Sequence, residues 1–245
     1  KEQEIQKIRG HDIAMIFQDV GAALDPIQKI KTQYSESIAV HEKKSAKEYF
    51  ELAVSMLKKM HLTDTKRVME SYPFELSGGM KQKLALCCAL IHRPAVLLLD
   101  EPTTGVDAVS RSEFWDMLSE LKGKGISMLV STPYMDEAVR CDRVALCDGG
   151  KILAVDTPQG VVGRFDEPLY ALAGDDMYGL LLEARRHADV KECYPFGQTH
   201  HLIAGEGFDA GRFVRETTAR GFRRVTLRPV GAGIEDVFIK LMRHA

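Results

Sequence analysis

The stretch Leu76-Ser77-Gly78-Gly79-Met80-Lys81-Gln82 is the most informative part of this chain. Apolar residues follow it at the spacing of a helix. They are Met80, Leu84, Cys87, Cys88 and Ile91. Ser77 is therefore predicted to cap the N-terminus of a helix, and the two glycines let the backbone come close to a ligand. The unpaired N–H groups and the positive dipole end of such a helix suit a phosphate. An ordinary capped helix is the alternative for this stretch alone.

A second motif follows soon after, Val96-Leu97-Leu98-Leu99-Asp100-Glu101-Pro102. The unbroken apolar run from Ala95 to Leu99 predicts a strand buried on both faces of a parallel sheet, with two carboxylates at its carboxyl end. Ligands bind at that edge of open α/β sheets. A carboxylate there can hold Mg²⁺, and its neighbour can polarise an attacking water. A strand that ends in a solvated acidic turn is the alternative.

In this order and at this distance, the two motifs resemble the signature motif and the Walker B strand of ABC-type ATPases. Pro102-Thr103-Thr104-Gly105-Val106-Asp107 continues the pattern, and the resemblance covers most of residues 12–160. It implies that Asp100 serves the metal, that Glu101 is the catalytic base and that Asp107 is the D-loop aspartate. It also implies a set of nucleotide-binding residues, namely Ser77, Gly78, Gly79, Gln82 and Asp107.

Gln18 follows the run Ile13-Ala14-Met15-Ile16-Phe17, which predicts a buried strand. In ABC ATPases a glutamine at this place belongs to the Q-loop. The resemblance implies that Gln18 contacts Mg²⁺ and the attacking water, and that it adjoins the contact with the membrane subunit. A loop glutamine without such a role is the alternative.

Two parts of the family pattern do not occur in this sequence. It has no Gly-x-x-x-x-Gly-Lys-Ser/Thr phosphate loop, and Gly150-Lys151 lacks the upstream glycine. Pro133 stands where the family has its H-loop histidine. The chain opens at Lys1, shortly before the Q-loop strand, which predicts an N-terminally truncated domain. We therefore expect residues 1–245 on their own not to hydrolyse ATP.

The composition, 45% hydrophobic and 28% charged over 245 residues, predicts a soluble globular protein of one or two domains. No apolar run approaches the ~20 residues of a membrane span. The formal charge of -2 gives no indication of nucleic-acid binding. The five cysteines form no CxxC motif and predict reduced thiols. The histidines at 200, 201 and 244 lack ligand partners at metal spacing, which predicts structural or exposed roles.

The predicted fold class is α/β, with an incomplete RecA-like P-loop NTPase core over residues 1–160. Residues 28–75 are predicted to form the helical subdomain of ABC ATPases, in which Ser45-Ala46-Lys47-Glu48 is a capping box. A helix is expected over residues 108–122, a strand over 127–132, and a hairpin over 144–155.

Thr157-Pro158 and the glycines up to Gly163 predict a domain boundary. Residues 165–245 then read as β-α-β-β-α-β, the order of a ferredoxin-like accessory domain. A final helix begins with Ile234-Glu235-Asp236-Val237-Phe238, and ABC ATPases of the drug-export type end in a similar stretch. Residues 8–76 instead resemble the ATPases of peptide and nickel importers, whereas residues 80–245 resemble the drug-export type.

The resemblance implies the ATP-binding component of an ABC transporter, with export favoured over import. It implies ATP and Mg²⁺ at a composite site between two ABC ATPase domains, fused or separate, and a transmembrane permease as partner at the cytoplasmic face of the inner membrane. No nucleic-acid partner is expected. Two alternatives stay open. One is a domain that does not hydrolyse ATP but completes a partner's site, and the other is a soluble ABC ATPase without a transport role.

Overall fold

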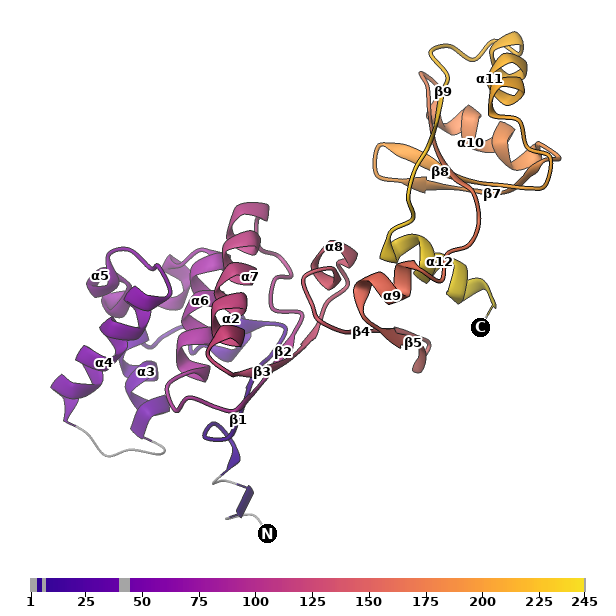
Figure 1. The fold of residues 1–245 in the computed structure, drawn as a ribbon. Helices are drawn as coiled ribbons and strands as arrows, with labels where there is room; N and C mark the ends of the chain where they lie inside the picture. The colour runs from indigo at the N-terminus through magenta and orange to yellow at the C-terminus, as the bar shows by residue number, and fades with distance from the viewer. Residues whose placement is uncertain (1–3, 6–7, 40–44, 245) are drawn as a thin grey trace. The chain divides into compact units, whose positions relative to one another are not determined.

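The computed structural model describes residues 4–5, 8–39 and 45–244 (Figure 1). They divide into two compact units, residues 1–134 and residues 135–245. The first unit contains a parallel sheet with helices, and the second contains a hairpin and an antiparallel sheet with helices. No helix in the described part of the chain is long and apolar enough to cross a membrane.

The sheet of the first unit has three strands in the order β1-β2-β3, and they are parallel, as the sequence predicts. They are β1 (Ile13–Ile16), β2 (Val96–Asp100) and β3 (Ser127–Ser131). Ile16 pairs with Leu99, and Asp100 pairs with Ser131. The carboxyl ends of all three strands therefore meet at one edge of the sheet.

Only one face of this sheet is well buried. The side chains of Ala14, Ile16, Leu97 and Leu99 are at most 5% exposed, whereas Met15 and Leu129 on the other face are 45% and 69% exposed. The prediction that the strand at 95–99 is buried on both faces is therefore wrong at Val96 and Leu98, which are only partly buried. The prediction of a buried strand at 13–17 is wrong at the exposed alternate positions Ile13, Met15 and Phe17. Side chains of a strand point to opposite faces in turn, and the described residues supply a covering layer for one face only.

Helices make up the rest of the first unit. They are α2 (Val20–Ala23), α3 (Ile30–Ala39), α4 (Ala46–Lys59), α5 (Thr65–Glu70), the 3-10 helix η1 (Pro73–Glu75), α6 (Gly78–Ala89) and α7 (Ala108–Gly123). The predicted helical segment at 28–75 is confirmed, apart from residues 40–44, which lie outside the described residues. The capping box is also confirmed, because Ser45 accepts from the Glu48 N–H and Glu48 accepts from the Ser45 N–H.

The second unit begins with α8 (Met135–Ala138), followed by the predicted hairpin of β4 (Val144–Asp148) and β5 (Lys151–Asp156). Residues 157–163, which predict a boundary, form α9 (Pro158–Val162), whose Val161 is completely buried. The described chain divides after residue 134, so the separate folding of residues 165–245 stays a prediction.

The rest of the second unit follows the predicted order of strands and helices. The elements are β6 (Leu169–Ala173), α10 (Met177–Arg186), β7 (Val190–Phe196), β8 (Thr199–Ala204), α11 (Ala210–Ala219), β9 (Thr226–Pro229) and α12 (Ile234–His244). The four strands form an antiparallel sheet in the order β7-β8-β6-β9. One apolar cluster joins the helices α10 and α11 to the sheet. It contains Leu172, Leu180, Ala184, Leu202 and Phe213.

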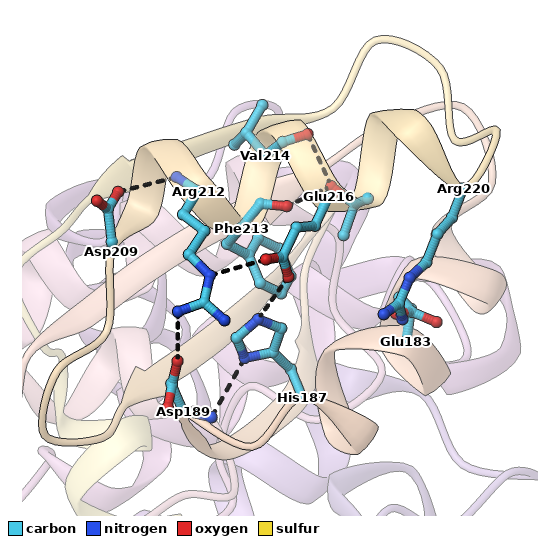
Figure 2. Close-up of polar contacts among 10 residues, drawn as sticks. Glu183, His187, Asp189, Asp209, Arg212, Phe213, Val214, Glu216 and Arg220 are labelled. Carbon is cyan, nitrogen blue, oxygen red and sulfur yellow. Dashed lines mark hydrogen bonds and ion pairs between the residues drawn. The ribbon is translucent and has the colours of Figure 1, made fainter.

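Polar contacts join the end of α10 to α11 (Figure 2). The Arg212 guanidinium donates to Glu216 at 2.7 Å, and His187 Nε2 lies 3.4 Å from the other Glu216 oxygen. The Asp189 N–H donates to His187 Nδ1 at 3.2 Å. The bond from Arg212 is the main reason why the pKa of the Glu216 carboxyl is lowered. These contacts fasten α11 to the loop after α10.

Candidate functional site

The structure brings Gln18, Asp100 and Glu101 together at the carboxyl edge of the parallel sheet. The Gln18 amide donates to Glu101 Oε2 at 2.9 Å, and the Thr104 hydroxyl donates to the same oxygen at 3.0 Å. The Ser131 hydroxyl donates to Asp100 Oδ1 at 2.6 Å. We call these five residues the edge group.

The backbone of Glu101 is held in an uncommon conformation. Its φ of 43° is in the left-handed region, which residues other than glycine rarely adopt. The Glu101 N–H donates to both the hydroxyl and the carbonyl oxygen of Ser131, at 3.0 and 3.1 Å. A strained backbone held by its surroundings is common at functional sites. Here it turns the Glu101 side chain toward Gln18 as the chain leaves β2.

The sequence predictions missed Thr104 and Ser131 as partners of the two carboxylates. Both residues carry a hydroxyl group and lie inside motif stretches, and these two facts could have indicated their role. Their contacts depend on the pairing of β2 with β3 and on the turn after Glu101, which a local pattern does not reveal.

The edge group offers oxygen ligands of the kind that Mg²⁺ prefers. Asp100 supplies a carboxylate, and Gln18 keeps its carbonyl oxygen as an acceptor because its amide nitrogen donates to Glu101. No group of three or more His, Cys, Asp or Glu side chains among the described residues could hold a metal. One carboxylate and one amide oxygen fit Mg²⁺, because Mg²⁺ usually binds through one or two protein oxygens together with phosphates and water.

Ser77 caps α6 as predicted, because its hydroxyl accepts from the Met80 N–H. The two glycines that follow have different surroundings. A Cβ on Gly79 would lie 2.8 Å from Ser110 Oγ, whereas a Cβ on Gly78 would meet only the Gly105 carbonyl at 3.5 Å. Packing of α6 against α7 thus requires the glycine at Gly79. Packing does not require it at Gly78, where the backbone stays open to a ligand.

Asp107 caps α7, a role that the sequence predictions did not assign to it. Its Oδ1 accepts from the N–H groups of Val109 and Ser110 at 3.1 and 3.0 Å. These bonds lower the pKa of the Asp107 carboxyl, and the bond from the Ser110 N–H has the largest effect. Because Gly79 packs on Ser110, the N-termini of α6 and α7 lie side by side and both present positive dipole ends.

Further along, an ion pair ties the same two helices together. Lys83 Nζ lies 2.7 Å from Glu113 Oε2, and the Lys83 side chain is only 11% exposed. Gln82, one residue before, is buried at 6% exposure, and its Oε1 has no hydrogen-bond partner within the part of the chain that the structure describes. The predicted contact of Gln82 with nucleotide stays a prediction.

Pro133 lies just beyond β3 and is exposed. The next residue, Tyr134, donates its N–H to the Thr132 hydroxyl at 3.1 Å. The Arg111 guanidinium carbon lies 4.6 Å from the centre of the Tyr134 ring, a cation–π contact. This contact links the first turns of α7 to the segment after β3.

A cavity of about 590 Å³ opens beside the end of β1, between α2, α3 and α6. Its lining is mostly apolar and includes Phe17, Leu24, Tyr34 and Cys88. Tyr34 is 1% exposed, and its hydroxyl has no hydrogen-bond partner among the described residues. Burial is the main reason why the pKa of Tyr34 is raised. Phe17, by contrast, is 61% exposed at the mouth of the cavity.

A parallel sheet with carboxylates at its edge, helices between β1 and β2, and the helix α6 capped by Ser77 are features of the α/β fold of ABC-type cassettes. Residues 1–104 match the family profile described as ABC transporter. The chain is 37% identical over 158 residues to the oligopeptide transport ATP-binding protein AmiE of Streptococcus pneumoniae, covering 64% of this chain and 44% of that protein. Residues 1–104 therefore form part of an ABC transporter domain.

Two further comparisons extend this result. A putative peptide import ATP-binding protein of Brucella melitensis is 32% identical over 206 residues, 83% of this chain and 59% of that protein. A solved component of the ABC transporter complex cbiONQ from Clostridium perfringens is 26% identical, with a TM-score of 0.57 over 67% of this chain and 64% of that one. The chain thus spans about half the length of the curated relatives that it matches.

The names of these relatives state oligopeptide transport and peptide import. The expectation that export is favoured over import therefore has no support from them. The alignment of 206 residues also extends well beyond residue 80, into the part of the chain that resembles the drug-export type.

We expect Gly79→Ala to destabilise the chain by about 1–3 kcal/mol, because the added methyl group overpacks the contact between α6 and α7. The double variant Gly79→Ala/Ser110→Gly should recover most of this loss. Gly123→Ala is the matched control, since a Cβ there would meet nothing within 4 Å. Chemical denaturation measures all three. Equal free energies of unfolding for Gly79→Ala and the wild type would contradict the close packing.

Because Asp107 caps α7 through its carboxylate, the free energy of unfolding should depend on pH under acidic conditions. The carboxyl has its pKa lowered below the ordinary value of 3.8 in the folded chain, so its stabilising effect is present above that value and is lost as the pH falls through the folded pKa. Asp107→Asn keeps a cap oxygen but does not titrate. The difference in unfolding free energy between wild type and Asp107→Asn should be constant above about pH 5 and shrink below about pH 4. A difference that grows on acidification would contradict this assignment.

Proposed function

We propose that this chain supplies the ATP-binding part of an ABC transporter. The hydrogen bond between Gln18 and Glu101, beside Asp100 at the sheet edge, is the observation that carries the proposal. Asp100 and the Gln18 carbonyl oxygen would hold Mg²⁺ together with ATP. Glu101 would accept a proton from water, and two donors on one of its carboxylate oxygens support this role.

When bound, the metal would neutralise part of the negative charge of the phosphates. Gln18 would orient the attacking water, because its amide already fixes the Glu101 carboxylate. Ser77 and Gly78 would act on a different nucleotide, one held by a second ABC ATPase domain, through the N–H groups at the start of α6. The Asp107 carboxylate, which caps α7 beside α6, offsets the positive dipole end of α7, so the phosphate would contact the N–H groups at the start of α6.

A membrane subunit is the second proposed partner, and the cavity beside β1 is the proposed place of contact. Its lining is apolar, it lies directly beyond the strand that carries Gln18, and Phe17 is exposed at its mouth. An apolar helix of a permease would bury these side chains at the cytoplasmic face of a membrane. Movement of Gln18 would then couple that contact to the edge group.

Peptide uptake is the transport class that the relatives' names support. Residues 165–245 are proposed to be a ferredoxin-like accessory domain of this component. The β7-β8-β6-β9 strand order supports this, and so does the common apolar cluster of α10 and α11 on the sheet.

A second candidate function is favoured by Pro133. Proline has no side-chain donor for a γ-phosphate, so this chain's own site would lack one transition-state contact, whereas Ser77, Gly78 and Gly79 are intact. The chain would then complete the ATP site of a partner domain without hydrolysing ATP itself. Losing one transition-state donor costs roughly 10²–10³ in rate.

Two substitutions in the complete transporter complex distinguish these functions. Ser77→Arg places a bulky cation at the N-terminus of α6, and we expect it to lower ATPase activity roughly 100-fold or more in both cases. Glu101→Gln should be equally severe if this chain hydrolyses ATP. It should change the activity less than about twofold if the chain only completes a partner's site. Phosphate release over time is the measurement.

Ser55→Arg is the matched control, because Ser55 is an exposed residue of α4. It should leave the rate unchanged. Residues 1–245 on their own should release no phosphate above background. Full activity of the complex with Ser77→Arg would refute the proposed function as a whole.

A further inference from the structure

Ser131 ends β3 directly opposite Asp100, the last residue of β2. Alternate side chains of a strand share a face, so both side chains lie on the face that carries Leu129. Leu129 is 69% exposed, which makes this the less covered face of the sheet within the described residues. The register of β2 and β3 therefore places a serine hydroxyl beside a carboxylate at an accessible edge.

The bonds of the Ser131 hydroxyl determine where its hydrogen points. A hydroxyl has one hydrogen to donate and two lone pairs that accept. Ser131 Oγ accepts from the Glu101 N–H at 3.0 Å and lies 2.6 Å from Asp100 Oδ1. An ionised carboxylate only accepts, so the hydrogen points toward Asp100 Oδ1. The separation lies in the range of hydrogen bonds from hydroxyls to carboxylates.

This bond distinguishes the two carboxylate oxygens of Asp100. Within the part of the chain that the structure describes, Oδ1 accepts from Ser131 and Oδ2 has no hydrogen-bond partner. The other hydroxyl of the edge group acts on a different carboxylate, because Thr104 donates to Glu101 Oε2. Among the described residues, Ser131 alone thus orients the Asp100 carboxylate, and Oδ2 stays available as a ligand.

We propose that Ser131 is a positioning residue for the metal site of Asp100. Its hydroxyl holds Asp100 Oδ1 and leaves Oδ2 for Mg²⁺, in the way that a hydrogen bond to a ligating carboxylate commonly orients it. The same hydroxyl oxygen accepts from the Glu101 N–H, so one side chain contributes to the positions of both edge carboxylates. The inference rests on the proposed function, in which Asp100 holds the metal.

Removal of this hydroxyl leaves the surrounding backbone supported. The Glu101 N–H also donates to the Ser131 carbonyl oxygen at 3.1 Å, and Ser131→Ala keeps that carbonyl. Ser131 is exposed, so its substitution removes little packing. Threonine keeps a hydroxyl and is favoured in strands, which makes Ser131→Thr the conservative variant.

Binding of a fluorescent, non-hydrolysable ATP analogue to the complete transporter complex tests the proposal. The affinity is measured with Mn²⁺ and again with EDTA, and the ratio of the two gives the contribution of the metal without any hydrolysis. Asp100→Asn identifies the part of this ratio that depends on the edge carboxylate. We expect Ser131→Ala to reduce the ratio roughly 10- to 100-fold, the usual effect of removing the partner of a ligating side chain.

The affinity in EDTA should be the same for Ser131→Ala and the wild type, because the hydroxyl acts on the metal ligand and not on the nucleotide. A purely structural role would weaken binding both with and without Mn²⁺. Ser131→Thr should restore the ratio, and Thr104→Val should leave it unchanged because Thr104 bonds to Glu101. Ser127→Ala is the matched control, since Ser127 is an exposed serine at the other end of β3.

The outcomes separate this inference from the proposed function. If Asp100→Asn lowers the ratio and Ser131→Ala does not, Ser131 has no positioning role, while the metal-binding role of Asp100 stands. If neither variant lowers the ratio, Asp100 holds no metal, and both the inference and the proposed role of the edge group fail. Equal losses for Ser131→Ala and Ser131→Thr would also overturn the inference, because the hydroxyl would then not be the cause.

Discussion

The parallel register of β1, β2 and β3 is the constraint on which the candidate site depends. Because Ile16 lies opposite Leu99 and Asp100 opposite Ser131, three chain segments far apart in sequence end at the same edge. The Ser131 hydroxyl can then bridge Asp100 and the Glu101 backbone, and Gln18 reaches the Glu101 carboxylate. A shift of one residue in β2 would turn its side chains to the opposite face and separate these groups.

A second arrangement is built from helix ends rather than strand ends. The caps at Ser77 and Asp107 start α6 and α7, and the close approach at Gly79 keeps both starts together. The edge group and the capped helices therefore carry different chemistry, the first suited to a metal and water and the second to an anion. The proposed role of completing a partner's ATP site would use the second arrangement and not the first.

The motifs predicted the cap at Ser77, because residue type and the nearby apolar pattern determine it. They predicted that Gln18 and Glu101 each follow a strand, but the hydrogen bond between them depends on the pairing of β1 with β2. They did not predict the exposed face at Met15 and Leu129, which depends on what covers the sheet. The cap formed by Asp107 and the requirement for Gly79 depend on how α6 meets α7. Each of these follows from packing between distant segments, which local spacing does not determine.

Labelling of the complete transporter complex with an ATP analogue that carries a photoreactive group on its γ-phosphate tests the separation of the two groups most directly. Trypsin separates residues 68–81, which contain the start of α6, from residues 84–111, which contain both the edge carboxylates and the start of α7. Fragmentation in the mass spectrometer then separates Asp100 and Glu101 from residues 107–110. If the chain serves a partner's nucleotide, the label should lie on 68–81 or on 107–110 and not on Asp100 or Glu101. Label on Asp100 or Glu101 without label at the two helix starts would contradict that account.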